Sequence, residues 1–268
     1  MTAAAEPLLF SVSDQIATIA FNNPAKRNVF DAEVRERLAE AVGQVRRDPA
    51  IRALVLTGAG GHFCSGGDLR NIAAAGLDTA GWRHRMRSLH EWLHDLITLD
   101  RPVIAAVDGA AAGAGFSLAM MADFVLATPR AKFCMSFLKV GLVPDMAAFY
   151  TLPRIVGVQR AKELMLSARD VGAEEALRLG LVMELHASEV LLDRAQALAA
   201  SFVGASPTAV SLIKRALEQA PGASLSALVD AEVNAQALAA ATSEHREAVR
   251  CFLDKQPLPF AWPVAPAG

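Results

Sequence analysis

Two short apolar segments, each followed at once by a glycine-rich turn, most constrain what this chain can fold into. Residues 53–57 (ALVLT) lead into the turn 58–68 (GAGGHFCSGGD), and residues 103–107 (VIAAV) lead into the turn 109–115 (GAAAGAG). Continuous apolar runs bounded by turn residues predict strands that are buried on both faces of a sheet. Each turn therefore places backbone N–H groups at the end of a strand, where they can hold an anion or a developing oxyanion. Tight turns and close packing alone are the competing explanation of these glycines.

The apolar pattern also predicts the elements around the turns. We expect strands at 8–12, 16–21 and 124–127, and helices at 31–45, 82–99, 113–121, 174–179, 189–202, 208–218, 225–241 and 244–253. Asp31 is expected to cap the first of these helices. Short strands that alternate with helices and then give way to a helical tail predict a layered α/β fold. We divide the chain into a core over residues 1–200 and a C-terminal helical region over residues 201–268.

Composition excludes several classes of protein. The chain has 268 residues, of which 53% are hydrophobic and 20% charged, so it is too apolar to be intrinsically disordered. Its 26 basic and 28 acidic residues give a net charge of −2, without the basic excess that nucleic-acid binding requires. The longest apolar stretch, residues 109–122, is shorter than the roughly 20 residues of a membrane span. We expect neither a nucleic-acid nor a membrane partner.

Targeting and metal-binding signals are missing from the sequence. The first ten residues lack the basic and apolar regions of a secretion signal. Cys64, Cys134 and Cys251 do not have metal-ligand spacing, and their odd number argues against a disulfide framework. Neither a GxGxxG nor a GxxxxGK[ST] motif follows the strands, so a nucleotide-binding fingerprint is unsupported. The sequence predicts a cytoplasmic, reduced and metal-free protein.

Taken together and in order, the turns and the segments around them resemble the crotonase (enoyl-CoA hydratase/isomerase) superfamily. The matching segments are 23–28 (NPAKRN), 63–69 (FCSGGDL), 101–109 (RPVIAAVDG), 113–119 (GAGFSLA), 122–125 (ADFV), 133–145 (ending in GLVPD), 154–157 (RIVG), 173–182 and 252–260 (FLDKQPLPF). Each segment alone is a weak signal, but the ordered set covers nearly the whole chain. Its GLVPD and AAGAG motifs look most like those of the phenylacetate-type (epoxyphenylacetyl-CoA) isomerases.

The resemblance implies a spiral of ββα turns, followed by a helical C-terminal region that assembles the chain into a homotrimer or hexamer. It also implies an acyl-CoA thioester substrate, with coenzyme A as part of that substrate and no separate cofactor. In the family the thioester oxygen lies between two backbone N–H groups, which map to Gly67 and Ala114 here. Relatives commonly have glycine at the second position, but alanine still supplies the N–H group. Two such donors stabilise the enolate that forms when a proton leaves the carbon next to the thioester.

The resemblance also assigns binding residues. The positions at which relatives hold the adenine and pantetheine parts of coenzyme A are Ala25, Lys26, Arg27, Ser65, Asp68 and Leu69. We expect the acyl pocket to be lined or supported by His90, Phe116, Ser117 and Phe137. The aromatic and methionine side chains around the proposed site favour an apolar or aromatic acyl group.

The two glutamates that hydratases of this family use are missing, because their positions carry Ser117 and Phe137. Neither side chain can do the acid and base work that adding water to a double bond requires. Asp145 is the remaining candidate base, since its apolar neighbours should desolvate the carboxyl group and raise its pKa. Relatives with aspartate here include dienoyl-CoA isomerase, the epoxyphenylacetyl-CoA isomerase and chlorobenzoyl-CoA dehalogenase. An aspartate after proline is also a common helix cap, here for a helix near residues 146–152.

Two groups of basic side chains lie on the predicted helix 82–99. His90 and His94 are four residues apart and so share a helix face, but they lack a third metal ligand. The dehalogenase has histidines at the matching positions, one of them catalytic, whereas its neighbouring tryptophan is replaced here by Phe137. The run Arg83, Arg85 and Arg87 is interpreted as a solvated helix face, which would contribute to binding the phosphates of coenzyme A only if the loop around it folds over the ligand.

The leading hypothesis is an acyl-CoA isomerase that moves a double bond through a thioester enolate, with Asp145 as its single base. An enoyl-CoA hydratase, an aryl-CoA dehalogenase and an acyl-CoA-binding pseudoenzyme are the alternatives. The apolar faces of the tail helices pack either on the chain's own core or on a neighbouring subunit.

Overall fold

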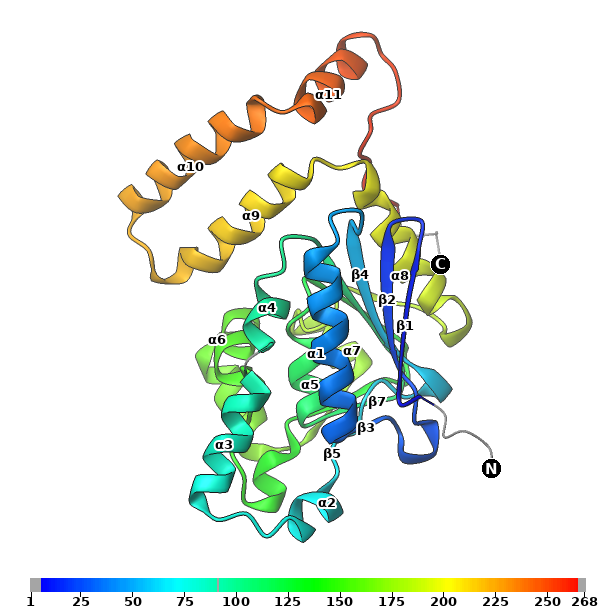
Figure 1. The fold of residues 1–268 in the computed structure, drawn as a ribbon, viewed down its shortest axis with the longest axis vertical. Coiled ribbons are helices and arrows are strands. Elements are labelled where there is room, and N and C mark those ends of the chain that lie inside the picture. The colour runs from blue at the N-terminus through cyan, green and yellow to red at the C-terminus, as the bar shows by residue number, and fades with distance from the viewer. Residues whose placement is uncertain (1–5, 91, 265–268) are drawn as a thin grey trace.

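The computed structural model describes residues 6–90 and 92–264, and a six-stranded sheet forms its centre (Figure 1). The strands are β1 (Leu8–Ser13), β2 (Ile16–Phe21), β4 (Ala53–Gly58), β6 (Val103–Val107), β8 (Phe124–Ala127) and β11 (Glu184–Leu185), in the order β1-β2-β4-β6-β8-β11. The first two strands form an antiparallel hairpin, and the other neighbours in this sheet pair in parallel. The five strands predicted from the sequence are thereby confirmed.

A second layer of short strands includes parts of both glycine turns. In this layer β3 (Val29–Phe30) pairs with β5 (Gly66–Gly67), and β9 (Lys132–Cys134) pairs with both β7 (Ala110–Ala112) and β10 (Asp170–Gly172). Each of β4, β6 and β8 is thus followed along the chain by a short strand of this layer, which gives the repeated unit of the expected spiral. Cys64 N donates to Ala110 O at 3.0 Å and Ala112 N donates to Cys64 O at 3.0 Å, so the two glycine turns lie side by side.

Eleven α-helices occur in the part of the chain that the structure describes. They are α1 (Ala32–Arg47), α2 (Leu69–Ala74), α3 (Thr79–His90), α4 (Leu93–Ile97), α5 (Ala114–Ala119), α6 (Ala148–Ser167), α7 (Ala173–Arg178), α8 (Ser188–Ser201), α9 (Pro207–Gln219), α10 (Leu225–Ala240) and α11 (Ser243–Leu253). Short 3₁₀ turns include η1 (Pro24–Lys26), η3 (Ser136–Val140) and η4 (Phe202–Gly204). In α1 the predicted cap is confirmed, because the Asp31 side chain accepts a hydrogen bond from Val34 N.

Both faces of the main sheet are buried, as its continuous apolar strands predict. Along β4, Leu54 and Leu56 belong to the core that α1 and α5 help to form, while Ala53 and Val55 point to the opposite face. There they pack against α8, whose buried side chains include Leu198. Helices on both faces of a parallel sheet give the layered α/β fold.

The sequence-based prediction of one helix over residues 82–99 is wrong. The chain instead forms α3, which ends at His90, and α4, which begins at Leu93. Leu89, Leu93 and Leu96 are all buried at helical spacing, so the apolar pattern does not distinguish one continuous helix from two. His90 and His94 consequently lie on different helices and do not share a helix face.

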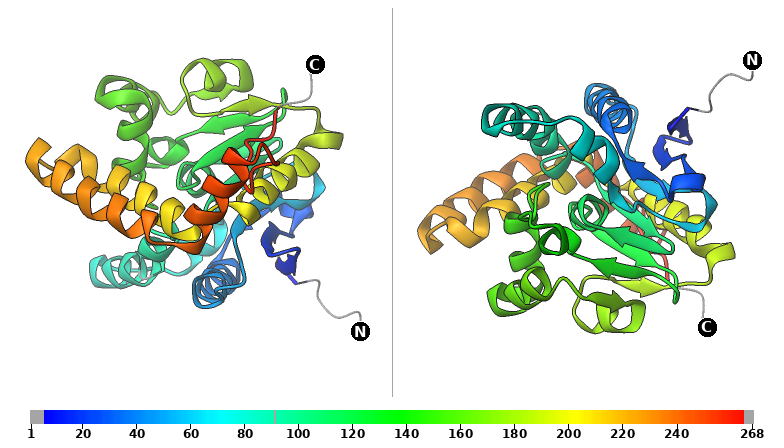
Figure 2. Two further views of the ribbon diagram at one scale, coloured as in Figure 1. Left: turned by 90° about the horizontal axis from the view of Figure 1, so that it is seen from above. Right: turned by 90° about the horizontal axis from the view of Figure 1, so that it is seen from below.

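The C-terminal helices α9, α10 and α11 extend away from the sheet as an arm, and the chain then returns to α8 (Figures 1 and 2). In this return segment Trp262 packs edge-on against Phe124 with ring centroids 5.4 Å apart, and Phe260 lies 5.7 Å from Phe202. These contacts tie the end of the chain to β8 and η4. No single described helix is long and apolar enough to cross a membrane, although the bent pair Ser188–Gly204 and Pro207–Gly222 passes that test when taken together.

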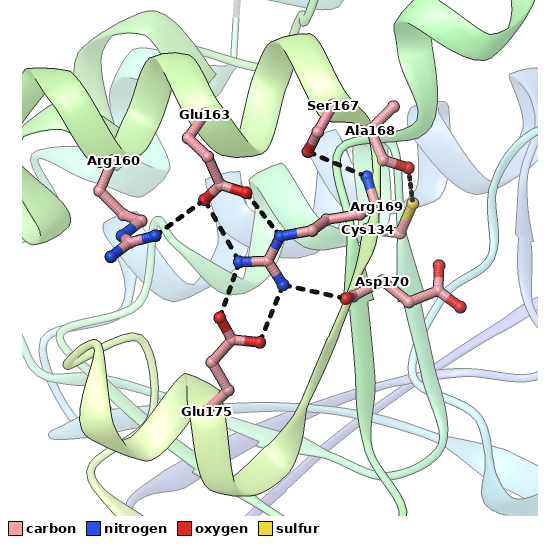
Figure 3. A network of polar contacts seen from close by, with 8 residues as sticks. All are labelled: Cys134, Arg160, Glu163, Ser167, Ala168, Arg169, Asp170 and Glu175. Carbon is pink, nitrogen blue, oxygen red and sulfur yellow. Dashed lines mark hydrogen bonds and ion pairs between the residues drawn. The ribbon is translucent and has the colours of Figure 1, made fainter.

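An arginine-centred network fixes the position of α6, the helix that follows Asp145 (Figure 3). Arg169 pairs with Glu163 of α6 at 2.5 Å and with Glu175 of α7 at 2.7 Å. The guanidinium group bridges the two carboxylates in the forked geometry that arginine favours. The network therefore joins the C-terminal end of α6 to β10 and α7.

Candidate active site

A cavity of about 290 Å³ lies beside the two glycine turns. The turns line it with Ser65, Gly66, Gly67, Gly113 and Ala114. Apolar side chains from several elements complete its wall: Phe30, Leu69, Ile72, Trp82, Met86, Leu89, Phe137, Val140, Leu142 and Met146. Four charged residues also line it, namely Arg35, Arg85, Lys139 and Asp145.

The structure brings Gly67 and Ala114 together on the wall of this cavity. Ala114 is the first residue of α5, so its N–H group has no acceptor within the helix. Gly66, beside Gly67, adopts a φ of +89°, and a Cβ atom there would lie 2.6 Å from Ala112 O. Glycine is thus required where the first turn meets the second. Gly67 and Ala114 thus bring two backbone N–H groups to the wall of a mostly apolar cavity, an arrangement that suits a developing oxyanion.

Asp145 is the only acidic residue among the described residues that line the cavity. Its Oδ1 atom is buried and has no hydrogen-bond partner in the described part of the chain. Burial raises the pKa of this carboxyl group to about 6, while the positive charges of Arg85 and Arg35 act in the opposite direction. A carboxyl group with such a pKa can exchange a proton near neutral pH.

Asp145 does not cap a helix, so that explanation of the residue is wrong. Helix α6 begins at Ala148, and its N-cap residue Ala147 makes no side-chain capping bond. Met146 and Ala147 have φ values of 52° and 56°, in the left-handed region. These two residues separate Asp145 from the first turn of the helix, and the carboxyl group is left free to face the cavity.

Arg35 and Arg85 are cavity residues that the sequence analysis did not assign to the site. Interpreting Arg85 as part of a solvated helix face is wrong, because its side chain is half-buried and lines the cavity. Arg85 lies four residues before the buried Leu89, so its helix position already placed it on the inner face. Arg35 lies three residues before the buried Leu38 and seven before the buried Val42, so its spacing also places it beside the buried face of α1, but the cavity that it lines depends on how α1 packs.

The segments expected to hold coenzyme A meet beside the cavity. Ser65 N donates to Arg27 O at 3.0 Å, and Ser65 Oγ donates to Lys26 O at 3.2 Å. Lys26 Nζ lies 3.8 Å from Asp68 Oδ2, and Asp68 also caps α2 by accepting from the N–H groups at positions 70 and 71. Ser65 and Leu69 line the cavity itself, while Ala25, Lys26 and Arg27 belong to the exposed η1 turn and the residue after it.

The structure places the four expected acyl-pocket residues differently. Phe137 lines the cavity, whereas Phe116 and Ser117 are fully buried in α5 and do not. Phe116 packs on Phe133 with ring centroids 5.4 Å apart, and Ser117 Oγ donates to Gly113 O. His90 is exposed and does not line the cavity. Because every residue of α5 is buried, its side chains pack in the core, while the first residue of the helix, Ala114, lines the cavity.

No cluster of three or more His, Cys, Asp or Glu side chains suited to a metal ion occurs in residues 6–90 and 92–264. Cys64 is fully buried, and burial raises its pKa to about 12. A thiol of that acidity is not a nucleophile at neutral pH. Asp145 is thus the carboxyl group of the cavity that can move a proton near neutral pH.

Comparison with known proteins places the chain among acyl-CoA enzymes. The enoyl-CoA hydratase/isomerase family profile matches residues 11–262. The 1,2-epoxyphenylacetyl-CoA isomerase of Escherichia coli (strain K12) is 38% identical over 94% of this chain and 97% of its own. A probable enoyl-CoA hydratase of Rhodobacter capsulatus is 36% identical over 94% and 96%.

Solved structures agree with these sequence relatives. The enoyl-CoA hydratase/isomerase of Cupriavidus metallidurans CH34 superposes with a TM-score of 0.92 at 47% identity, covering 98% of this chain and 99% of its own. The fold expected from the resemblance is confirmed by this agreement. The chain belongs to the enoyl-CoA hydratase/isomerase family.

Proposed function

We propose that the protein is an acyl-CoA isomerase that moves a double bond, with Asp145 as its single proton-transferring residue. The thioester oxygen accepts hydrogen bonds from the N–H groups of Gly67 and Ala114. Asp145 removes a proton from the carbon next to the thioester, and the electron pair of that C–H bond delocalises into the enolate. The same carboxyl group then returns the proton to the far end of the conjugated system. Coenzyme A takes part as the carrier of the acyl group, and no separate cofactor enters the reaction.

The unpartnered carboxyl oxygen of Asp145 supports this proposal most directly. It is buried against an apolar wall and belongs to a group with a pKa of about 6. A buried carboxylate oxygen without a hydrogen bond costs stability, so its retention fits a group that has to meet substrate. The two backbone donors on the same cavity wall would supply the complementary half of the reaction, each contributing on the order of 3 kcal/mol to the transition state.

Hydration is the second candidate, because one of the relatives described above is a probable hydratase. Adding water across a double bond needs acid and base work at two centres. Ser117 lies away from the cavity and is bonded to Gly113 O, and Phe137 has no titratable group. These positions favour isomerisation. Dehalogenation finds little support in the exposed side chain of His90.

Deuterium exchange tests the proposal. Straight-chain 3-enoyl, dienoyl and arylacetyl-CoA esters are incubated with the protein in D₂O, and the label is read by mass spectrometry. We expect label in at least one ester with the wild type and none with Asp145→Asn. Label that survives in the variant would assign the base elsewhere. Binding of all the esters without any exchange would favour a pseudoenzyme, and addition of water to a 2-enoyl ester would favour a hydratase.

We also propose that the protein acts in the cytoplasm as a homotrimer or hexamer. The support for assembly is the apolar surface of the C-terminal arm, where no residue of α9 or α10 is buried within this chain. Ile213, Leu217 and Leu225 are among the exposed side chains of the arm. Exposed apolar faces of this kind mark interaction surfaces, and a second copy of the chain would bury them.

A further inference from the structure

We propose that Arg35 and Arg85 form a subsite for a negatively charged oxygen group on the acyl part of the substrate. The enzyme then favours acyl-CoA esters whose acyl chain carries a second carboxylate. This inference rests on the proposed function, because it assumes that the acyl group occupies the cavity that Asp145 lines.

Two guanidinium groups line one largely apolar cavity. Arg35 comes from α1 and Arg85 from α3, and both side chains are half-buried. Within residues 6–90 and 92–264, neither guanidinium group makes a hydrogen bond or an ion pair. Arg85 instead makes a cation–π contact with Trp82, whose ring centroid lies 5.9 Å from Arg85 Cζ. A charge-assisted hydrogen bond stabilises a partly desolvated cation strongly, and the described residues supply no acceptor for these two guanidinium groups.

Neighbouring arginines on the same helices behave differently. Arg37 of α1 is exposed and lies 3.9 Å from Glu40. Arg87 of α3 is exposed and does not line the cavity. The inward placement of Arg35 and Arg85 is therefore a property of these two positions and not of arginine-rich helices in general.

Asp145 does not form an ion pair with either arginine among the described residues, although their charges lower its pKa. Its Oδ1 atom lacks a hydrogen-bond partner, and no ion pair joins it to Arg35 or Arg85 in the described part of the chain. An arginine and a carboxylate that can reach one another normally pair. These three groups instead line one cavity without an ion pair among the described residues, so a ligand in that cavity can contact them.

The charge of this group of side chains identifies the ligand chemistry. The cavity wall carries three cationic side chains, those of Arg35, Arg85 and Lys139, and one carboxylate, so it has a surplus of positive charge that grows when Asp145 takes up a proton. Burial and the charge of Arg85 lower the pKa of Arg35, although the carboxylates of Asp31, Glu36 and Asp145 act in the opposite direction. A carboxylate on the acyl chain reduces this surplus and can accept two parallel hydrogen bonds from one guanidinium group. The apolar wall around it holds the hydrocarbon part of the chain.

A purely electrostatic role is the competing explanation, in which the two arginines only keep Asp145 ionised. That role would affect every acyl group equally. The carboxylate subsite, in contrast, affects acidic acyl groups and spares neutral ones.

Calorimetric binding of two unreactive esters separates these explanations. Adipyl-CoA and hexanoyl-CoA have six-carbon acyl chains that end in a carboxylate and a methyl group. We expect the wild type to bind adipyl-CoA about tenfold more tightly or better, as one charge-assisted hydrogen bond allows. Arg35→Met and Arg85→Met should each reduce the ratio of the affinities for adipyl-CoA and hexanoyl-CoA toward one. Neither substitution should weaken the binding of hexanoyl-CoA to the same extent. Arg85→Lys should keep part of the preference, while Arg37→Met and Arg87→Met should leave it unchanged.

Equal affinity of the wild type for both esters, or equal losses for both in the variants, would overturn the subsite. If Arg35→Met and Arg85→Met fail to fold, the wild-type preference and its decrease in Arg85→Lys still decide the question. The exchange experiment separates this result from the proposed function. A carboxylate preference without Asp145-dependent exchange would retain the subsite and remove the isomerase. Exchange without the preference would do the reverse, and failure to bind either ester would end both.

Discussion

At the scale of single residues, the carboxyl group of Asp145 is held in a state that suits proton transfer better than stability. Its Oδ1 atom is buried without a hydrogen-bond partner among the described residues, and burial raises the pKa of the carboxyl group although two arginines act against that change. A base with a pKa near the working pH can accept a proton and also give it back. The same environment makes the ionised form costly in the folded protein, and both consequences can be measured.

The pH dependence of catalysis follows from the first consequence. Only the ionised form of Asp145 can accept a proton, so activity should fall as the pH decreases through about 6. We expect kcat/KM for the exchanging ester to be constant above this pH and to fall about tenfold for each unit well below it. Arg85→Met should move the midpoint upward, because the positive charge of Arg85 lowers the pKa of Asp145. A profile that stays flat down to pH 4.5 would contradict Asp145 as the base.

The pH dependence of stability follows from the second consequence. The pKa of Asp145 is raised on folding from 3.8 to about 6, so the folded state binds the proton more tightly than the unfolded state. The penalty is therefore absent below pH 3.8, grows between 3.8 and about 6, and is complete above that value. Asp145→Asn should raise the melting temperature by about 2 to 6 °C at pH 7.5, given about 1.4 kcal/mol for each pKa unit. At pH 4 the two proteins should melt within about a degree, and a variant less stable at both pH values would contradict the assignment.

At the scale of elements, the contact between the two glycine turns holds the candidate oxyanion site together. Gly66→Ala would place a Cβ atom 2.6 Å from Ala112 O and force the turns apart. We expect at least a tenfold loss of kcat together with a lower melting temperature. Gly76→Ala is the matched control, because Gly76 also has a positive φ, of +55°, but nothing lies within 4 Å of the added atom. Equal effects of the two substitutions would show that backbone strain, and not the contact between the turns, is responsible.

The elements that the sequence predicts well are those that carry their own local signals. Helix α1 begins where Asp31 caps it and buries Val34, Leu38 and Val45 at helical spacing. The strands of β5 and β7 were not predicted, since each is only two or three residues long and is defined by its partner in the second layer. The break between α3 and α4 was missed because the apolar spacing continues across it.

The same distinction applies to the site. The glycine turns and Asp145 could be found from the sequence because motifs in a fixed order carry them. Helical spacing places Arg35 beside the buried face of α1, but its membership of the cavity could not be predicted, because that depends on the packing of α1 against segments far away in the chain. Phe116 and Ser117 were expected in the pocket on the strength of their position after the second turn, yet α5 turns both into the core. Their proximity to the site along the sequence did not determine where their side chains point.

At the scale of the whole molecule, the chain consists of a well-packed body and an arm that buries little of itself. The body encloses the sheet between helices on both faces, whereas α9 and α10 contact mainly one another. The return of the chain after α11 to β8 and η4 closes the arm into a loop anchored at both ends (Figure 1). An arm held in this way presents its apolar side chains in a fixed arrangement, which favours a specific partner over loose association.

Assembly through the arm can be tested with one charge. Leu217 of α9 is 68% exposed in the single chain, and in a homotrimer or hexamer we expect this surface to be covered. Leu217→Glu would bury an unpaired carboxylate in the interface, which costs several kcal/mol and should shift the protein toward monomers in light scattering after size exclusion. Leu192→Glu on α8 is the control, since Leu192 is also exposed but lies on the body of the molecule. A wild type that is already monomeric, or a Leu217→Glu variant that remains fully assembled, would argue that this part of the arm serves another purpose.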